Sequence, residues 1–152
     1  MTLRPSGPAE AETLFRLQKE ASLVALRHVF PPERYPYPDD EIRQRWRDFP
    51  GSVLLAEREG EPLGVAGFEG CWLHGLYVVP AEWGSGVAGL LHDAVVEVLA
   101  DCPELHLWVL TANARARHFY ERRGWRLDGT TRVVPFPPHP VDVGYTLVHE
   151  QP

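Results

Sequence analysis

The chain has 152 residues, 44% of them apolar and 24% charged, which suits a single globular domain over residues 1–152 and leaves too little sequence for a second. Fifteen Lys and Arg against 21 Asp and Glu give a net charge of −6, so we expect no nucleic-acid partner and no attraction to anionic lipid. The apolar runs are interrupted well before the ~20 residues of a membrane-spanning helix, which argues against a membrane segment.

The N-terminal half is predicted to hold one strand, two helices and a three-stranded antiparallel meander. Residues 8–27 form the first helix, whose apolar stripe at helical spacing is Leu14, Leu17, Ala21 and Val24. Asp39 or Asp40 is expected to cap the second helix, which runs to about Asp48. The strands are expected over residues 2–5, 52–59, 62–69 and 71–79, with a hairpin turn at Glu59-Gly60-Glu61.

The C-terminal half alternates helices and strands. Its first helix has an apolar face, with His92 on the opposite side, formed by Val87, Leu90, Leu91, Val95, Val98 and Leu99. A strand at 105–110, a helix at 112–123 that ends at Gly124, and strands at 125–135 and 141–149 follow. Proline-rich segments at 31–38 and 135–140 must be loops, because proline lacks an amide hydrogen. The predicted fold class is therefore α/β (α+β), a mixed sheet with helices on its faces.

The cysteines and histidines suggest neither a disulfide framework nor a metal site. Cys71 and Cys102 are 31 positions apart and form no Cys-x-x-Cys motif, so reduced thiols are predicted, with a long-range disulfide as the alternative. The seven histidines show no metal-binding spacing, so no metal is expected. The start of the sequence lacks the apolar segment of a secretory signal, which predicts a cytoplasmic protein.

Residues 76–91 form a strand, a glycine-rich turn and the start of an apolar helix. Glycine has no Cβ, so the amides of residues 84–89 can approach a ligand closely. The unpaired N–H groups and the dipole of a helix start favour an anion there. The turn therefore predicts a phosphate or pyrophosphate site, with a tight turn that binds nothing as the alternative.

Two other nucleotide-binding motifs fit the sequence less well. A phosphate-binding loop needs a lysine after its last glycine, and the only lysine is Lys19. Gly84, Gly86 and Gly89 satisfy a Gly-x-Gly-x-x-Gly dinucleotide pattern, but the next strand does not end in the required acid. The antiparallel strands upstream also argue against a doubly wound dinucleotide fold.

Two motifs and the order of the elements together resemble the GNAT N-acetyltransferase superfamily over essentially the whole chain. The first motif is Leu-Tyr-Val-x-Pro with the turn Trp83-Gly84-Ser85-Gly86-Val87-Ala88, similar to the family's Gln/Arg-x-x-Gly-x-Gly/Ala. The second runs from Asn113 to Trp125 and is similar to Asn-x-x-Ala-x-x-Phe-Tyr-x-x-x-Gly-Phe. The resemblance implies a mixed central sheet of about seven strands, flanked by about four helices, with a cleft where the sheet splays.

This resemblance implies that acetyl-CoA binds in a V-shaped opening between the strands at 71–79 and 105–110. Its diphosphate would lie on the main-chain amides of Gly84, Ser85, Gly86, Val87, Ala88 and Gly89. Its pantetheine arm would pair, like an added strand, with the exposed main chain of Leu76, Val78 and Val79. The Val78 N–H would polarise the thioester carbonyl.

Side chains of the second motif would complete the site. In the family, an acceptor amine attacks the thioester directly, and a tyrosine at the position of Tyr120 commonly protonates the departing thiolate. Asn113 and Tyr120 are seven residues apart and share a helix face, so both could face the cofactor, although Asn113 could instead be only a helix cap. Arg117 shares that face and could meet a CoA phosphate; Tyr120 could instead be a core aromatic.

The sequence departs from the family at Trp83, where Gln or Arg is usual, and at Trp72, where relatives often carry an acid. The general base is therefore open among five candidates: Glu69, His74, Glu33, Asp40 and His139. The proline loops would shape the acceptor pocket, with an aromatic wall suited to a cationic or aromatic amine and formed by Tyr35, Tyr37, Trp46, Trp72 and Phe136. Trp46 is favoured as a core residue instead.

The leading hypothesis is an acetyl-CoA-dependent N-acetyltransferase acting on a primary amine of a small molecule or peptide. A non-catalytic acyl-CoA-binding module is the main alternative, because Trp83 is unusual and no base is obvious. A nicotinamide-dependent oxidoreductase is a third. The family resemblance also allows a homodimer.

Overall fold

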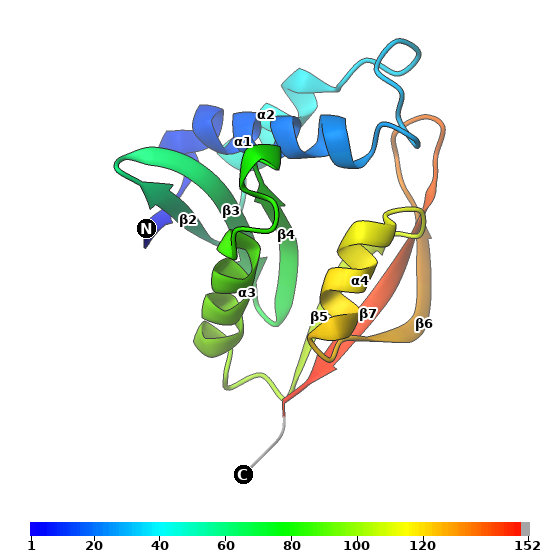
Figure 1. The fold of residues 1–152 in the computed structure, drawn as a ribbon. Coiled ribbons are helices and arrows are strands. Elements are labelled where there is room, and N and C mark those ends of the chain that lie inside the picture. Colours follow the sequence, from blue (N-terminus) through cyan, green and yellow to red (C-terminus); the bar gives the residue numbers. More distant parts are fainter. Residues whose placement is uncertain (150–152) are drawn as a thin grey trace.

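The computed structural model describes residues 1–149, which form a seven-stranded sheet with helices on both faces (Figure 1). The sheet order is β1-β2-β3-β4-β5-β7-β6. In chain order the strands are β1 (Thr2–Ser6), β2 (Ser52–Arg58), β3 (Glu61–Glu69), β4 (Trp72–Val78), β5 (Glu104–Leu110), β6 (Arg126–Val133) and β7 (Val141–Val148). The α-helices are α1 (Ala11–Ala25), α2 (Asp39–Arg47), α3 (Val87–Val98) and α4 (Ala114–Arg122), with short 3-10 turns at Pro8–Glu10 and Pro80–Glu82. The predicted element order and fold class are confirmed.

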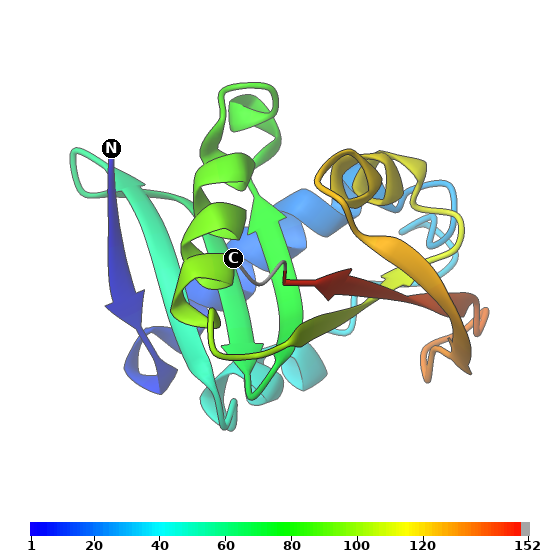
Figure 2. The same ribbon diagram turned by 90° about the horizontal axis from the view of Figure 1, so that it is seen from below.

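All neighbouring strands pair antiparallel except β4 and β5. That parallel pair is short, because Trp72 lies opposite His106 and Leu73 opposite Leu107, and no further pair follows. Beyond these residues the two strands diverge (Figure 2). The predicted splay is therefore present, and it opens toward the carboxyl ends of β4 and β5.

Two apolar clusters cover the two faces of the sheet. The first joins α3 and α4 to the sheet, with Leu91, Tyr120 and Trp125 among its buried residues. The second joins α1 and α2 to the opposite face and contains Leu14 and Trp46. Trp46 is thus a core residue, as favoured from the sequence.

The predicted apolar faces of the helices were wrong at three aliphatic positions. Val24, Leu90 and Val98 are all at least half exposed, although helical spacing placed each on its apolar stripe. His92, predicted to face away from the apolar side of α3, is buried. Its Nε2 accepts a hydrogen bond from the Trp125 indole N–H at 2.9 Å, so a polar residue takes a core position by pairing with a buried donor.

The cap of α2 also differs from the prediction. The N-cap residue is Pro38, and no side chain caps the helix. Asp39 and Asp40 instead lie in the first turn, where their negative charge complements the helix dipole.

The prediction of reduced thiols was wrong, because Cys71 and Cys102 form a disulfide with their Cα atoms 5.8 Å apart. Cys71 immediately precedes β4 and Cys102 immediately precedes the loop into β5. The main chain joins the same region, since the His106 N–H donates to the Cys71 carbonyl at 2.9 Å. A sequence separation of 31 does not reveal that the two strands begin side by side. The cytoplasmic location stays a prediction.

Among residues 1–149, no helix is long and apolar enough to cross a membrane. Over the same residues, no group of three or more His, Cys, Asp and Glu side chains is placed to hold a metal ion.

Candidate active site

The main chain of β4 is unpaired on its β5 side beyond Leu73. On its other side β4 pairs with β3: the Val79 N–H donates to the Leu63 carbonyl at 3.0 Å, and Val78 lies opposite Gly64. Residues of an antiparallel ladder alternate in the direction of their hydrogen bonds, so the N–H and C=O groups of Leu76 and Val78 point into the splay. An extended ligand could pair with both Leu76 groups and the Val78 N–H, whereas the Val78 carbonyl already accepts from the Trp83 indole N–H.

A cavity of about 540 Å³ occupies the open end of the splay. Its walls come from β4, the turn that follows, α4 and the end of α1, which crosses above the gap in Figure 1. Eight of the residues predicted to bind the cofactor line it: Leu76, Val78, Gly84, Gly86, Ala88, Gly89, Asn113 and Tyr120. The structure thus brings together the two sequence motifs, which are separated by a strand and a helix.

The glycine-rich turn needs its glycines for conformation and for space. Gly84 has φ of 84° and Gly86, the N-cap of α3, has φ of 97°, a region that other residues rarely adopt. A Cβ built on either would meet no protein atom within 4 Å, because both face open space. Within the described residues 1–149, no side chain caps α3, so its first N–H groups are free for an anion. The Ser85 N–H is not among them, since it donates to the Glu82 carbonyl at 3.1 Å.

Four basic side chains on α4 and the residue after it line the cavity, although the chain as a whole is acidic: Arg115, His118, Arg122 and Arg123. Arg123 lies beside the turn, because a Cβ built on Gly89 would be 3.0 Å from its guanidinium. The one acid in the lining, Glu82, is paired with Arg58 at 2.9 Å, and this hydrogen bond lowers the pKa of Glu82. Sequence reasoning missed these arginines, because no local pattern shows that the end of α4 lies beside the start of α3.

Trp83 has a specific place in this cavity. Its indole N–H donates to the Val78 carbonyl at 2.8 Å, and the Arg115 guanidinium lies 4.2 Å from the centre of its ring. The residue that departs from the family pattern therefore packs beside the unpaired main chain of β4.

Tyr120 is buried at 7% exposure and lines the cavity with its ring packed against Trp125. Burial, followed by the nearby Tyr77, raises the pKa of the Tyr120 phenol above its ordinary value. The hydroxyl is therefore protonated at physiological pH.

The remaining predicted residues do not line the cavity. The Arg117 Nε donates to the Tyr145 hydroxyl at 2.9 Å, and an Nη donates to the Thr111 carbonyl, so this arginine holds α4 to the sheet. The Val87 side chain is in the core, and Val79 pairs with β3. Asn113 does line the cavity, and it also caps α4 by accepting from the Ala116 N–H at 3.2 Å, so both weighed roles are compatible.

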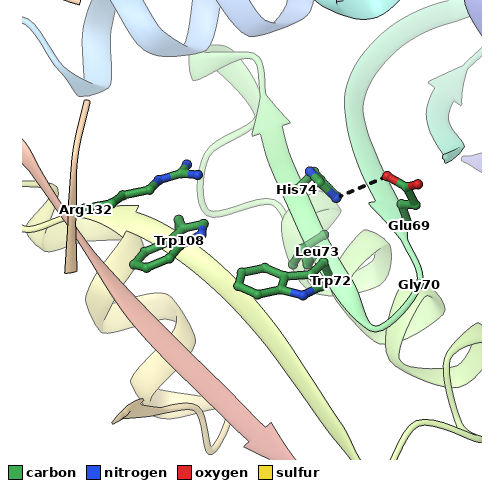
Figure 3. Close-up of a pocket in the computed structure, with 7 residues that line it drawn as sticks. All are labelled: Glu69, Gly70, Trp72, Leu73, His74, Trp108 and Arg132. Carbon is green, nitrogen blue, oxygen red and sulfur yellow. Dashed lines mark ion pairs between the residues drawn. The ribbon is translucent and has the colours of Figure 1, made fainter. Parts of the chain in front are cut away.

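A second cavity of about 490 Å³ lies along the first half of β4 and is lined by Glu69, Gly70, Trp72, Leu73, His74, Trp108 and Arg132 (Figure 3). A bulge re-aims the strand here: Gly67 pairs with Gly75 and Phe68 with Leu73, which leaves His74 without an opposite residue. His74 belongs to this cavity and Leu76, two residues further along β4, belongs to the first.

Two of the five candidate bases line this second cavity, and they contact each other. His74 Nε2 is 3.7 Å from a Glu69 carboxylate oxygen, as the dashed line in Figure 3 marks. Partial burial lowers the pKa of His74, while the Glu69 charge opposes that shift. His74 is therefore neutral at pH 7 and able to accept a proton. Glu33, Asp40 and His139 lie outside both cavities.

The predicted aromatic wall is mostly placed elsewhere. Tyr37 packs in the α1 and α2 cluster with Phe136. Tyr35 lies beside Arg34, with 5.6 Å between the guanidinium and the ring centre. Of the predicted wall only Trp72 lines the second cavity, and its partner there is Trp108, which the sequence did not single out.

An open mixed sheet splays beside a glycine-rich turn, and free main-chain groups of β4 and of the start of α3 line one cavity. Residues 17–125 match the family model described as Acetyltransferase (GNAT) family. The chain belongs to this family, as its motifs indicated.

Similar proteins agree with this assignment. An uncharacterized N-acetyltransferase of Mycobacterium bovis is 31% identical over 86 residues, which is 52% of this chain and 55% of the relative. A probable N-acetyltransferase of Mycobacterium tuberculosis is 28% identical over 102 residues, 62% of this chain and 55% of that protein. The chain thus spans about half the length of these curated relatives.

Solved structures show the same fold. The apo form of YjaB from Escherichia coli has a TM-score of 0.79 at 22% identity, with 98% of each chain covered. The PaiA N-acetyltransferase of Thermoplasma acidophilum, solved in complex with coenzyme A, has a TM-score of 0.70 at 15% identity, with 98% of this chain and 100% of that chain covered.

Proposed function

We propose that this chain is an N-acetyltransferase that transfers acetyl from acetyl-CoA to a primary amine. The observation that carries the proposal is the first cavity, where unpaired β4 main chain, an uncapped helix start and an arginine-rich rim face one space. Such a space suits a ligand with an amide-rich arm and a diphosphate, which are the two parts of coenzyme A. When bound, acetyl-CoA supplies the activated acetyl group.

Different residues of the first cavity bind different parts of acetyl-CoA in this proposal. The Leu76 main-chain groups pair with the pantetheine arm, and the Val78 N–H stabilises charge on the thioester oxygen, while the Val78 carbonyl accepts from the Trp83 indole. The free amides at the start of α3 receive the diphosphate, and Arg123 neutralises part of its charge. Tyr120 donates the proton that the departing thiolate requires. Gly84 and Gly86 leave room for the phosphates, and Ala88 and Gly89 line the same cavity.

The second cavity holds the acceptor in this proposal. His74 accepts the proton that the attacking amine loses, either directly or through water, and the Glu69 charge stabilises the imidazolium that forms. In this proposal the base comes from the second cavity and the acid from the first.

Two measurements test the proposal. Calorimetry with acetyl-CoA is expected to show saturable binding of one equivalent, and a thiol-release assay over a panel of amines is expected to show amine-dependent turnover. If properly folded protein retains no coenzyme at millimolar concentration, the proposal is wrong.

The non-catalytic binding module makes a different prediction in the same experiment. Its specific support is the Trp83 indole, which occupies the Val78 carbonyl in the pantetheine path. A module would bind acetyl-CoA and release no thiol with any amine. A nicotinamide-dependent enzyme would bind its nucleotide without competition from CoA.

A further inference from the structure

The second cavity carries opposite charges at its two ends. Arg132 from β6 stands at one end and Glu69 from β3 at the other, with two indoles between them (Figure 3). These indoles, Trp72 and Trp108, are stacked with ring centres 6.0 Å apart and planes inclined by 26°. His106 lies against Trp72, with 5.1 Å between the ring centres, so the cavity has an aromatic wall between a cation and an anion.

Arg132 is positioned by its Nε and keeps its other donors free. The Nε donates to the buried Asp142 carboxylate at 2.9 Å, and the guanidinium lies 4.8 Å from the centre of the Trp108 ring. Within residues 1–149, no side chain or main-chain oxygen accepts from its Nη atoms, and the side chain is 55% exposed. A guanidinium held in this way presents two parallel N–H groups, the arrangement that binds a carboxylate.

Glu69 has the complementary property at the other end. In the part of the chain that the structure describes, its ion-pair partner is His74 at 3.7 Å, and no Lys or Arg side chain pairs with it. Burial lowers the pKa of His74, so this partner is neutral at pH 7. The Glu69 carboxylate is therefore available to an ammonium group beside the residue that we propose as base.

We propose that the acceptor is an aminocarboxylate whose ammonium and carboxylate groups are separated by a flat apolar segment. The ammonium lies at Glu69 and His74, the apolar segment packs against the wall formed by Trp72 and Trp108, and the carboxylate binds Arg132. Glu69 and Arg132 stand on opposite sides of the cavity in Figure 3, so the two charged groups of the acceptor belong on different carbon atoms. The inference rests on the proposed function only in naming this ligand as the acceptor.

The test is a binding measurement with matched probes and no cofactor. 4-(Aminomethyl)benzoate carries both charges, and 4-(aminomethyl)benzamide has the same shape without the carboxylate charge. We expect the wild-type protein to bind the acid about tenfold or more tightly than the amide by calorimetry, as hydrogen bonds to a charged group would give. In Arg132→Gln the two probes should bind within about twofold of each other.

Two further variants keep the result interpretable. Arg126→Gln removes an arginine from the same strand but outside the cavity, and the preference for the acid should persist. Arg132→Lys keeps the charge but loses the paired donors, so its preference should be intermediate, and it serves if Arg132→Gln fails to fold. Equal affinities for the two probes in the wild-type protein would overturn the inference. A preference of wild-type size in Arg132→Gln, or in Arg132→Lys where Arg132→Gln does not fold, would also overturn it.

Failure of this inference is distinguishable from failure of the proposed function. A protein that binds acetyl-CoA but shows no preference for the acid overturns the acceptor class alone. If the protein prefers the acid but does not bind acetyl-CoA, the proposed transferase activity is wrong, while the second cavity still binds an aminocarboxylate. Thiol release with 4-(aminomethyl)benzoate, but not with benzoate, would show that the ligand of the second cavity is also an acceptor of the transferase.

Discussion

The two cavities along β4 are built from different parts of the polypeptide. The first consists largely of main chain: the unpaired edge of β4, a turn held open by Gly84 and Gly86, and the start of α3. The second consists of side chains that come from β3, β4, β5 and β6. A main-chain site imposes a local pattern on the sequence, whereas a side-chain site depends on which distant strands meet. The first cavity is therefore easier to predict from the sequence, and the side chains that line the second are less constrained by the fold.

Removal of the Tyr120 hydroxyl is expected to give the largest effect. Tyr120→Phe should lower turnover by ~10²–10⁴-fold, because the departing thiolate loses its proton donor, while the dissociation constant for acetyl-CoA changes by less than about twofold. A thiol-release assay measures turnover, and calorimetry measures the dissociation constant for acetyl-CoA. Tyr35→Phe, outside both cavities, is the control. Unchanged turnover of Tyr120→Phe across a pH series would remove this residue from the acid role.

Substitution in the glycine turn tests the main-chain cavity directly. Gly86→Val should weaken CoA binding by roughly tenfold or more, because the branched side chain crowds the phosphates and opposes the positive φ. Gly129→Val is matched to it: Gly129 has φ of 86° and open space around its Cβ position, but it lies in β6. Equal CoA affinity in Gly86→Val and the wild type would mean that the turn is not the binding site.

Arg123 should contribute less than the turn, since exposed charges are screened by salt. Arg123→Gln is expected to raise the dissociation constant for CoA by about three- to tenfold at low ionic strength and by less at high salt. Titrations at two salt concentrations measure this, with Arg126→Gln as a control on charge alone. A loss that is independent of salt would argue against a contact with phosphate.

The smallest expected effect is a shift of a pH profile on the acceptor side. If His74 acts as base, kcat/KM rises with pH through the His74 pKa, which burial places below its ordinary 6.5. The Glu69 charge raises that pKa, so Glu69→Gln should move the rising limb to lower pH. If the rising limb of Glu69→Gln lies at the same pH as in the wild type, His74 is not the group whose titration the profile reports.

The fold was largely predictable because its signals are local. Hydrophobic period, proline loops and the glycine turn gave the correct element order, and the turn also located the first cavity. Exposure of Val24 and Val98 was missed, because the predicted stripe extends into the last turns of the helices. Leu90 is half exposed beside the fully buried Leu91, so the buried face of α3 is narrower than predicted. The burial of His92 depends on the Trp125 indole, 33 positions away, which no helical period encodes.

The candidate site was only partly predictable for the same reason. Glu69 and His74 were among the candidate bases because they lie on the predicted meander, but three loop residues were equally plausible from sequence. Trp108 and Arg132 come from strands whose neighbours only the sheet order reveals. The Arg117 side chain was assigned to the cofactor from its helix face, but Tyr145 on β7 binds it.

The disulfide between Cys71 and Cys102 fixes one end of the opening that both ligands would share. Together with the two residue pairs of the β4–β5 ladder, it covalently anchors the narrow end of the V. Any widening to admit a bulkier acyl chain must therefore come from bending of the strands past Leu73 and Leu107, while the spacing at the vertex stays constant.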